Sequence, residues 1–356
     1  MRDTYQKIIT DFKFKNKLEY KKTSFQLRKI LSPITHSKLN DEFELNSVDE
    51  IPIFFDIFHD KRAEETVDKL MSGMNSKEFE LLKKILNKLI EFNNLCENKS
   101  LPYNSILRHF YQYRLLSKLL PNCRSLLEIG PGSGFLPLIS VMSNDEINYI
   151  CTDISEAYFL TQEILYNYFN LLDEERHHLK KGKILHLPWW EYINLIKKNL
   201  KIDCIIINHA ICEMHEDAIK FLLKTSLNLD NKFFFLEGKG YDKFFSFKNV
   251  KKLFRVYGYK LIYEKNDVYI FENKKNFKKN NDTIEKLSDY PFLRILIKEF
   301  EFFFNKINEK INHQNKSIFK ESDYKIEEIN KFYQKIYTEK KIQSLSESFF
   351  NMIKAK

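Results

Sequence analysis

The sequence predicts an α/β fold: a doubly wound, mostly parallel sheet closed by an antiparallel hairpin, with helical regions at both ends of the chain. Three observations predict it. Strand-like and helix-like apolar patterns alternate between residues 125 and 258, which is typical of a parallel sheet with helices on both faces. A glycine-rich turn joins the first strand-like run to the first helix-like run. Two further strand-like runs, separated by a tight turn at Asn266, end the pattern and predict the hairpin.

The region before the alternation is expected to be mostly helical. Apolar residues recur at helical spacing over 79–95, whereas residues 42–55 interrupt the pattern and predict a loop or a short strand. An amphipathic helix is expected over 105–120, and Pro121 ends it. We then expect parallel strands at 125–129, 147–153, 183–187, 202–208 and 232–238, helices at 135–142, 155–172, about 190–199, 215–227 and 247–258, and hairpin strands at 259–265 and 267–273.

The polar remainder of the chain predicts one or more C-terminal helices, such as 292–311. Three regions follow from this pattern: a helical N-terminal region at 1–120, an α/β domain at 121–275 and a helical C-terminal extension at 276–356. We expect the first region to serve as a cap or to recognise a substrate. Both helical extensions are places where a homo-oligomer contact could form.

Composition excludes several classes of protein. The net charge is +9, but only nine of the 58 basic residues are Arg, and the lysines are spread along the chain. This pattern indicates a solvated lysine surface rather than a nucleic-acid footprint, which would cluster basic residues on one face. No apolar run approaches the ~20 residues that a membrane span needs. None of the five cysteines forms a C-x-x-C pair and no hydrophobic signal core begins the chain, so we expect a cytoplasmic protein with reduced thiols.

The glycine-rich turn reads "LLEIGPGSGFLPL" over residues 126–138 and holds three of the eight glycines in the chain. Such a turn between a strand and a helix presents backbone N–H groups to a ligand. A dinucleotide site requires G-x-G-x-x-G, but here the glycines are Gly130, Gly132 and Gly134, and Phe135 stands where the third dinucleotide glycine would be. No Gly-Lys-Ser/Thr follows, which argues against a P-loop.

The run from Glu128 to Gly134, acidic-x-G-x-G-x-G, resembles motif I of class I S-adenosylmethionine-dependent methyltransferases. The resemblance covers about 110–275 and implies a Rossmann-like, seven-stranded sheet that binds S-adenosyl-L-methionine. It implies that Glu128 takes the ligand ammonium and that Asp153, 19 residues after Gly134, accepts both ribose hydroxyls. The other cofactor-binding residues that it implies are Ile154, Leu187, Asn208 and Arg114.

One part of the adenine site departs from the family pattern. Many members of the family carry an acidic residue just after the third strand, where this chain reads "HLPWWEY". We therefore expect His186, Leu187 or a backbone group to bind the adenine amino group. Trp189 and Trp190 could wall the adenine or the acceptor, or could be packing residues.

A second, finer resemblance is to bacterial sugar O-methyltransferases. It rests on Asn208-x-x-x-x-Glu213-Met214, on Glu237-Gly238-x-Gly240 and on a Tyr/Arg-bearing helix that leads into motif I. In that helix Arg108, Tyr111 and Arg114 are spaced three apart and are expected to share one face. The resemblance implies that an Arg there reaches the methionine carboxylate or an acidic sugar.

Methyl transfer to a hydroxyl gains from a base that removes the proton, and His215 or Glu213 could be that base. Both residues could instead cap the following helix, whose first turn is acidic. Another small molecule or a lipid could be the acceptor, and a catalytically decayed cofactor-binding scaffold is a further alternative. The stretch "NHAI" is not the Asn/Asp-Pro-Pro-aromatic tetrad of base methylation. No adjacent Asp pair follows the fourth strand and no Cys/His cluster has zinc spacing, so we expect no metal.

Overall fold

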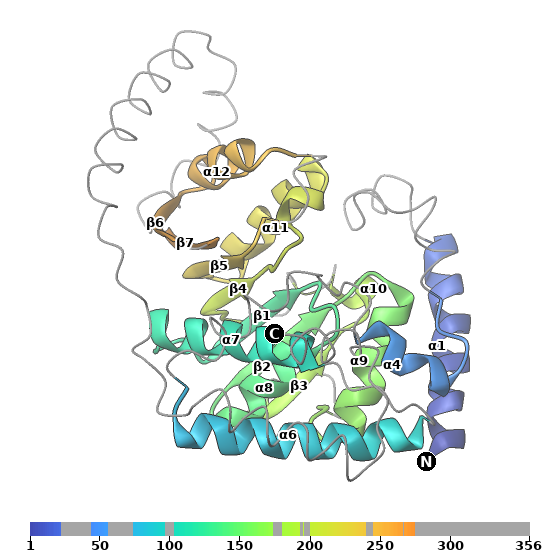
Figure 1. Cartoon of the computed structure of the whole chain (residues 1–356). Helices are drawn as coiled ribbons and strands as arrows, with labels where there is room; N and C mark the ends of the chain where they lie inside the picture. The colour runs from blue at the N-terminus through green and yellow to red at the C-terminus, as the bar shows by residue number, and fades with distance from the viewer. Residues whose placement is uncertain are drawn as a thin grey trace, which may run out of the picture.

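The computed structural model describes residues 1–22, 44–55, 74–96, 103–173, 180–192, 195, 200–239, 245–265 and 267–274. Its centre is a seven-stranded sheet with the strand order β3-β2-β1-β4-β5-β7-β6 (Figure 1). The strands are β1 (Ser125–Ile129), β2 (Asn148–Thr152), β3 (Lys183–His186), β4 (Cys204–Ile206), β5 (Phe233–Glu237), β6 (Tyr259–Lys265) and β7 (Val268–Asn273).

The pairing of the strands confirms the predicted fold class. The first five strands pair in parallel, whereas β7 runs antiparallel between β5 and β6. Of the seven strands, only β7 in the terminal hairpin runs opposite to the others, as the tight turn after residue 265 predicts. Strand β4 is shorter than expected and ends at Ile206, although the N–H groups of Ile207 and His209 still donate to carbonyls of β5.

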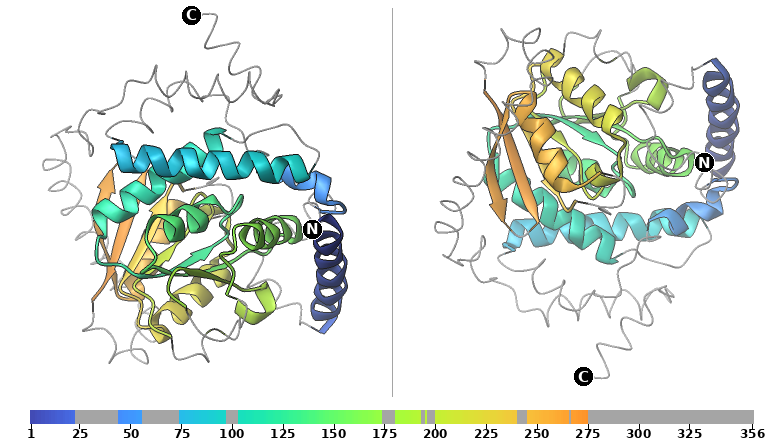
Figure 2. Two further views of the ribbon diagram at one scale, coloured as in Figure 1. Left: turned by 90° about the horizontal axis from the view of Figure 1, so that it is seen from below. Right: turned by 90° about the horizontal axis from the view of Figure 1, so that it is seen from above.

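Helices cover both faces of the sheet (Figure 2). The α-helices of the described residues are α1 (Arg2–Lys22), α4 (Ile51–Phe54), α6 (Ser76–Leu95), α7 (Tyr103–Leu119), α8 (Phe135–Ser143), α9 (Glu156–Tyr168), α10 (Trp189–Tyr192), α11 (Glu216–Asn228) and α12 (Phe247–Val256), and the short 3₁₀ helices are η1 (Val48–Glu50) and η3 (Ile211–Glu213). Helices α11 and α12 lie on one face, and α1, α6, α8 and α9 lie towards the other (Figure 1).

A loop or short strand is predicted over 42–55; residues 44–47 are irregular, residues 48–54 form the two helical turns η1 and α4 instead, and residues 42–43 lie outside the described residues. Ser47 starts the first turn, because its hydroxyl accepts a hydrogen bond from the backbone N–H of Asp49. Helix α10 covers the start of the predicted helix at 190–199, and residues 193–194 and 196–199 lie outside the described residues. The predicted C-terminal helices and the turn residue Asn266 also lie outside them.

The N-terminal helices share one hydrophobic core with the sheet. Ile9 of α1, Leu86 of α6 and Phe110 of α7 belong to the same buried cluster as Phe135 of α8 and Leu160 of α9. A second buried cluster fills the other face, between the sheet and α11 and α12. The proposed boundaries at residues 120 and 275 stay predictions. None of the helices in the described ranges is long and apolar enough to cross a membrane.

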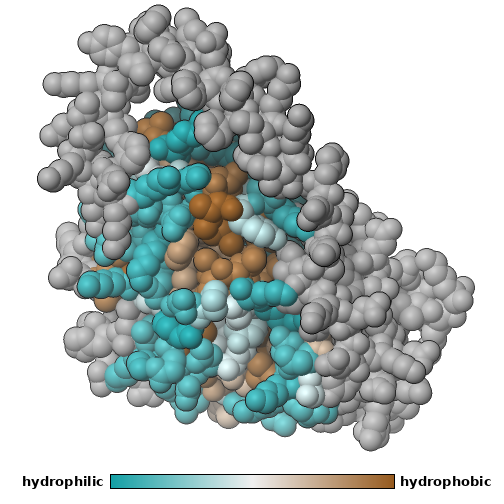
Figure 3. All heavy atoms as spheres, turned by 90° about the vertical axis from the view of Figure 1, so that its left-hand side faces the viewer, coloured by the Kyte–Doolittle hydropathy of each residue, from teal (hydrophilic) through white to brown (hydrophobic). Residues whose placement is uncertain are grey.

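Strand β6 forms one edge of the sheet, and its side chains alternate between exposed and partly buried positions from Lys260 to Lys265. Ile262 is the most exposed large hydrophobic residue of this strand, at 46%. Figure 3 shows the molecule from this side, and hydrophobic side chains gather in the middle of an otherwise hydrophilic face. The predicted site residues do not lie on this face but at the carboxyl ends of β1 to β5.

Candidate cofactor and acceptor site

The predicted site residues follow the carboxyl ends of neighbouring parallel strands. Glu128 of β1 pairs with Ile206 of β4, and Ile206 pairs with Phe235 of β5. Two residues further along these strands come Gly130, Asn208 and Glu237, so all three leave the sheet at the same edge. Ligands of open α/β sheets bind at this edge.

The three glycines of the turn have positive φ angles of 70°, 57° and 79°, which L side chains rarely adopt. Their surroundings differ. A Cβ on Gly130 or Gly132 would meet nothing within 4 Å, whereas a Cβ on Gly134 would come within 2.7 Å of the Tyr166 hydroxyl. The first two glycines therefore line open space, and the third is needed for packing. Gly134 is also the N-cap of α8 without a side-chain cap, which leaves N–H groups of the first turn free of a capping side chain.

Asp153 directly follows β2 and is 7% exposed. Its carboxylate accepts hydrogen bonds from the backbone N–H of Ser155 at 3.0 Å and from the side-chain amide of Gln162 at 3.0 Å. Backbone N–H groups of Gly132 and Ile154 also stabilise its charge, but burial outweighs them and raises the pKa of Asp153 to about 6. The carboxylate thus holds the glycine turn in place and lies beside it.

Glu128 lies beneath the same turn and is 1% exposed. It accepts a hydrogen bond of 2.8 Å from the hydroxyl of Tyr149, on the neighbouring strand β2. Burial raises the pKa of Glu128 to about 8, so the carboxyl group is mostly protonated near neutral pH. A cation beside it would favour the charged form.

A buried polar chain that the sequence analysis missed connects β3 to the glycine turn. The Gln162 side-chain amide donates to the carbonyl of Gly132 at 2.6 Å as well as to Asp153. Its oxygen lies 2.9 Å from Nε2 of His186, whose Nδ1 lies 2.7 Å from the Glu163 carboxylate. Because Gln162 and Glu163 lie inside a helical pattern that reads as amphipathic, no sequence signal separates them from surface residues.

Helix α7 faces the site with Ser105, Arg108 and Gln112, which stand at positions i, i+3 and i+7 and form one stripe on a helix. The Ser105 hydroxyl lies 3.2 Å from the hydroxyl of Ser133 in the glycine turn. Arg108 is hydrogen-bonded to the imidazole of His209, and the side-chain amide of Gln112 donates to Glu237 at 2.8 Å. One helix therefore contacts both the glycine turn and the ends of β4 and β5.

The expected common face of Arg108, Tyr111 and Arg114 does not occur. Arg114 is buried and ion-paired at 3.2 Å with Glu78 of α6, and Tyr111 is buried in the core. A drift of about 60° per three residues separates the two arginines, because a helix has 3.6 residues per turn. Arg114 therefore lies between α6 and α7, and its proposed contact with the cofactor is not supported by this position.

His209 and Glu237 form a pair at the ends of β4 and β5. Nε2 of His209 is paired with the Glu237 carboxylate, and Arg108 lies 3.9 Å from the same carboxylate. Although the partial burial of Glu237 acts to raise its pKa, hydrogen bonds from His209 and Gln112 and the charges of His209 and Arg108 lower that pKa to about 2. The His209 side chain is 39% exposed, so the imidazole remains accessible beside a partly buried carboxylate.

Two residues with left-handed backbone conformations lie at this pair. His209 has a φ of 54°, and Gly238 has a φ of 72°. A Cβ on Gly238 would lie 2.0 Å from Nδ1 of His209, so the imidazole occupies the space that a side chain would need. Left-handed non-glycine residues cost about 1–3 kcal/mol and cluster at functional sites.

The other predicted site residues have local partners. His215 caps α11, since its Nδ1 accepts from the backbone N–H of Asp217 at 3.2 Å. Leu187 is buried after β3 and its N–H donates to the carbonyl of Cys151. The Asn208 side-chain oxygen accepts from the backbone N–H of Glu237 at 3.0 Å. Glu213 ends η3, and its side chain lies outside the described residues. Catalysis by His215 or Glu213 stays a prediction.

Gly238→Ala is expected to lower the free energy of unfolding by about 1–3 kcal/mol more than Gly130→Ala. Both glycines have nearly the same φ, 72° and 70°, but only a Cβ on Gly238 collides with a side chain. Urea denaturation of both variants measures the difference. Equal losses of stability would show that the imidazole of His209 does not occupy this space.

Parts of this chain are similar to solved protein structures. The methyltransferase domain of bacterial CtHen1 is 14% identical, and the match covers 46% of this chain and 97% of that one at a TM-score of 0.34. Magnesium protoporphyrin IX methyltransferase from Synechocystis PCC 6803, with bound SAH, is 10% identical, with 49% and 86% covered at a TM-score of 0.36. The strand order of the described sheet is by itself Rossmann-like.

A third match is TrmK from M. capricolum, in complex with S-adenosylhomocysteine. It is 15% identical, with 65% of this chain and 97% of that one covered at a TM-score of 0.31. No protein-family model matches the sequence, and neither does any curated protein. In the part of the chain that the structure describes, no group of three or more His, Cys, Asp or Glu residues could hold a metal ion.

Proposed function

We propose that the protein is an S-adenosylmethionine-dependent methyltransferase. One observation carries the proposal: Gly130 and Gly132 line open space with positive φ angles, and the carboxylate of Asp153 lies directly beside them. A glycine cradle without phosphate-binding residues suits a zwitterionic amino-acid end, and a carboxylate at the end of β2 suits two ribose hydroxyls.

Each half of this ligand has candidate partners. Gly130 and Gly132 leave room for the methionine end, and Glu128 lies beneath the turn as a counter-charge for its ammonium. Asp153 would hold the ribose. Ile154 and Leu187 follow β2 and β3, which are paired up to Cys151 and His186, and they would flank the adenine. The bound cofactor would supply an electrophilic methyl group.

Titration calorimetry with S-adenosylhomocysteine tests the proposal. It should also detect the release of a proton when the ligand binds. The pKa of Glu128 is raised to about 8, so near neutral pH the empty site holds a mostly neutral carboxyl group. An adjacent ligand ammonium lowers that pKa, and binding should release up to about one proton. The binding enthalpy should therefore depend on the ionisation enthalpy of the buffer.

Glu128→Gln is the control for this experiment, because it replaces the carboxyl group by an amide of similar size that has no proton to release. The buffer dependence should be lost in that variant. No binding of S-adenosylhomocysteine by the unaltered protein would overturn the proposed function. Binding without any dependence on the buffer would instead remove Glu128 from the ammonium site.

For the acceptor we propose a hydroxyl oxygen, most simply of a sugar in a surface-glycan or capsule pathway. The pair of His209 and Glu237 supports an oxygen acceptor, since an imidazole backed by a carboxylate can take the hydroxyl proton during methyl transfer. Arg108 beside the pair favours an acceptor that also carries an anionic group. Another small molecule or a lipid with such a hydroxyl is the alternative acceptor.

A further inference from the structure

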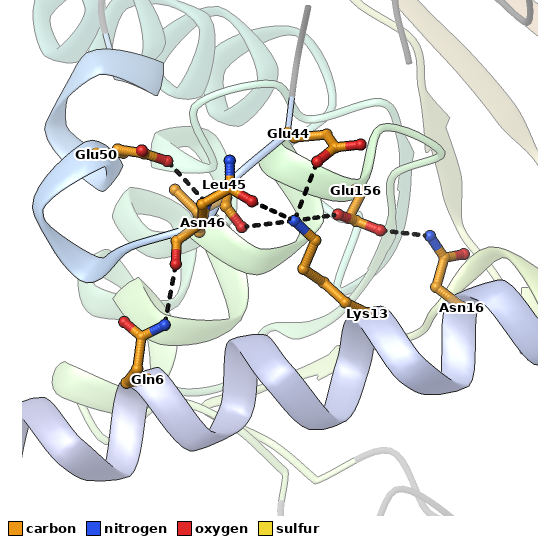
Figure 4. Close-up of polar contacts among 8 residues, drawn as sticks. All are labelled: Gln6, Lys13, Asn16, Glu44, Leu45, Asn46, Glu50 and Glu156. Carbon is orange, nitrogen blue, oxygen red and sulfur yellow. Dashed lines mark hydrogen bonds and ion pairs between the residues drawn. The ribbon is translucent and has the colours of Figure 1, made fainter. Parts of the chain in front are cut away.

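Helix α1 packs against α9, the helix that follows the end of β2, where we propose that the nucleoside half of the cofactor binds. Its residue Asn16 is bonded on both sides. The Asn16 side-chain NH₂ donates to the Glu156 carboxylate at 2.8 Å (Figure 4). The Asn16 side-chain oxygen accepts from the indole N–H of Trp189 at 2.9 Å. A single side chain thus joins α9 to α10.

The two partners begin the helices that follow β2 and β3. Glu156 is the first residue of α9, three residues after Asp153, and Trp189 is the first residue of α10, two residues after Leu187. The N–H of Leu187 donates to the carbonyl of Cys151 at 2.9 Å, so the two connections leave the sheet side by side. Because the glycine turn occupies the β1 side of Asp153, a base attached to the ribose would lie between these two connections.

A stack of rings forms a second link from α1 to the site. Phe12 of α1 stacks on Phe159 with ring centroids 4.5 Å apart, and Phe159 stacks on His186 at 4.0 Å. His186 then contacts Gln162, which binds Asp153 and the carbonyl of Gly132. The position of α1 is therefore transmitted to the groups that would hold the ribose and the methionine end.

Other contacts hold α1 in place without Asn16. Figure 4 shows Lys13 between Glu44, Leu45, Asn46 and Glu156, with its ammonium 2.7 Å from the side-chain oxygen of Asn46 and 3.5 Å from the Glu156 carboxylate. Gln6 donates to the carbonyl of Asn46 at 2.9 Å. Loss of Asn16 should therefore leave the helix docked and affect only the spacing of the two connections.

We propose that Asn16 is a positioning residue for the adenine nucleoside site. Through Asn16, helix α1 fixes the connections after β2 and β3 at the distance from each other that the adenine base requires. This rests on the proposed function, because it presumes that the ligand is an adenine nucleoside. The site would accept the nucleoside whether or not the amino-acid end is attached.

The test measures binding of two probes by calorimetry: S-adenosylhomocysteine and 5′-methylthioadenosine, which has the nucleoside but lacks the amino-acid end. Asn16→Ala should weaken both probes by the same factor of about ten, equivalent to about 1.4 kcal/mol. Gln6→Ala is the matched control, since it removes one bond of the same helix far from both connections. It should leave both affinities within about twofold of those of the unaltered protein.

A purely structural role is distinguished by comparing affinity with stability. Both variants should lower the melting temperature slightly, but only Asn16→Ala should weaken binding. Trp189→Phe removes one of the two bonds from the other side, and combining it with Asn16→Ala should add little, because residues of one network do not contribute additively. If Asn16→Ala does not fold, Trp189→Phe alone tests the inference.

Unchanged affinities in Asn16→Ala and Trp189→Phe would overturn the inference and leave the proposed function intact. Weaker binding of S-adenosylhomocysteine alone would also overturn it, since the effect would then lie at the amino-acid end. If the unaltered protein bound neither probe, the proposed function itself would fail and the inference would fail with it.

Discussion

Asp153→Ala is expected to abolish measurable binding of S-adenosylmethionine. Two hydrogen bonds from ribose hydroxyls to a carboxylate contribute about 1.5–3 kcal/mol each, so their loss weakens binding by more than about 100-fold. The glycine turn would also lose support, because the same carboxylate holds the N–H of Gly132 and the amide of Gln162. Calorimetric titration with S-adenosylmethionine measures the effect.

Gly132→Val should have a similar result for a different reason. Its Cβ would meet no protein atom within 4 Å, so the valine side chain would extend into the space proposed for the methionine end. The positive φ of 57° adds strain for a β-branched residue. If both Asp153→Ala and Gly132→Val bound the ligand with unchanged affinity, the cofactor site would lie elsewhere.

Asp203→Ala is the matched control. Asp203 accepts hydrogen bonds from the backbone N–H groups of Arg124 and Ser125 at 2.9 and 3.0 Å and pairs with Lys232. It lies at the amino end of β4 and therefore at the opposite edge of the sheet. Its removal should lower stability and leave the affinity for S-adenosylmethionine unchanged.

His209→Ala and Glu237→Gln are expected to lower methyl transfer by about 10²–10⁴-fold, which is the usual contribution of a general base. Binding of S-adenosylhomocysteine should survive in both variants, because neither residue belongs to the glycine cradle. Transfer of a radiolabelled methyl group from S-adenosylmethionine to a panel of sugars and acidic sugars measures the loss.

His215→Ala provides the comparison, since the sequence alone favours His215 or Glu213 as the base. In the structure His215 caps α11, so its loss should lower stability by about 1 kcal/mol, as for other caps, and leave methyl transfer near its original rate. The reverse outcome, with His215→Ala inactive and His209→Ala active, would show that the general base is His215, at the start of α11. Full transfer by all three variants would place the base on another residue.

Much of the architecture could be predicted because strands and helices impose different periods on the sequence. The alternation of apolar runs between residues 125 and 258 predicted five parallel strands, and the runs at 259–273 predicted the antiparallel hairpin. The boundaries were less accurate at β4, where Asn208 and His209 read as a continuation of the strand or its first loop residues. No local pattern predicts the left-handed backbone of His209, whose imidazole packs over Gly238.

The grouping of His209, Glu237 and Arg108 was not predicted, for a similar reason. His215 and Glu213 stand next to a predicted helix start, so sequence proximity favoured them, whereas His209, Glu237 and Arg108 come from three separate elements. Arg114 was expected beside Arg108, but the rotation of the helix directs it to Glu78 of α6. Pairing of distant residues depends on strand register and helix docking, which a single sequence does not express.

The sequence by itself determined the glycine turn, the carboxylate after the second strand and the order of strands and helices, because each depends on local backbone requirements or on periodic burial. Only the tertiary structure decided that Gly134 serves packing while Gly130 and Gly132 line open space, that Gln162 links Asp153 to His186, and that α1 reaches the strand ends through Asn16. These contacts join residues that lie far apart along the chain, and they form because the packed helices and paired strands bring them within hydrogen-bonding distance.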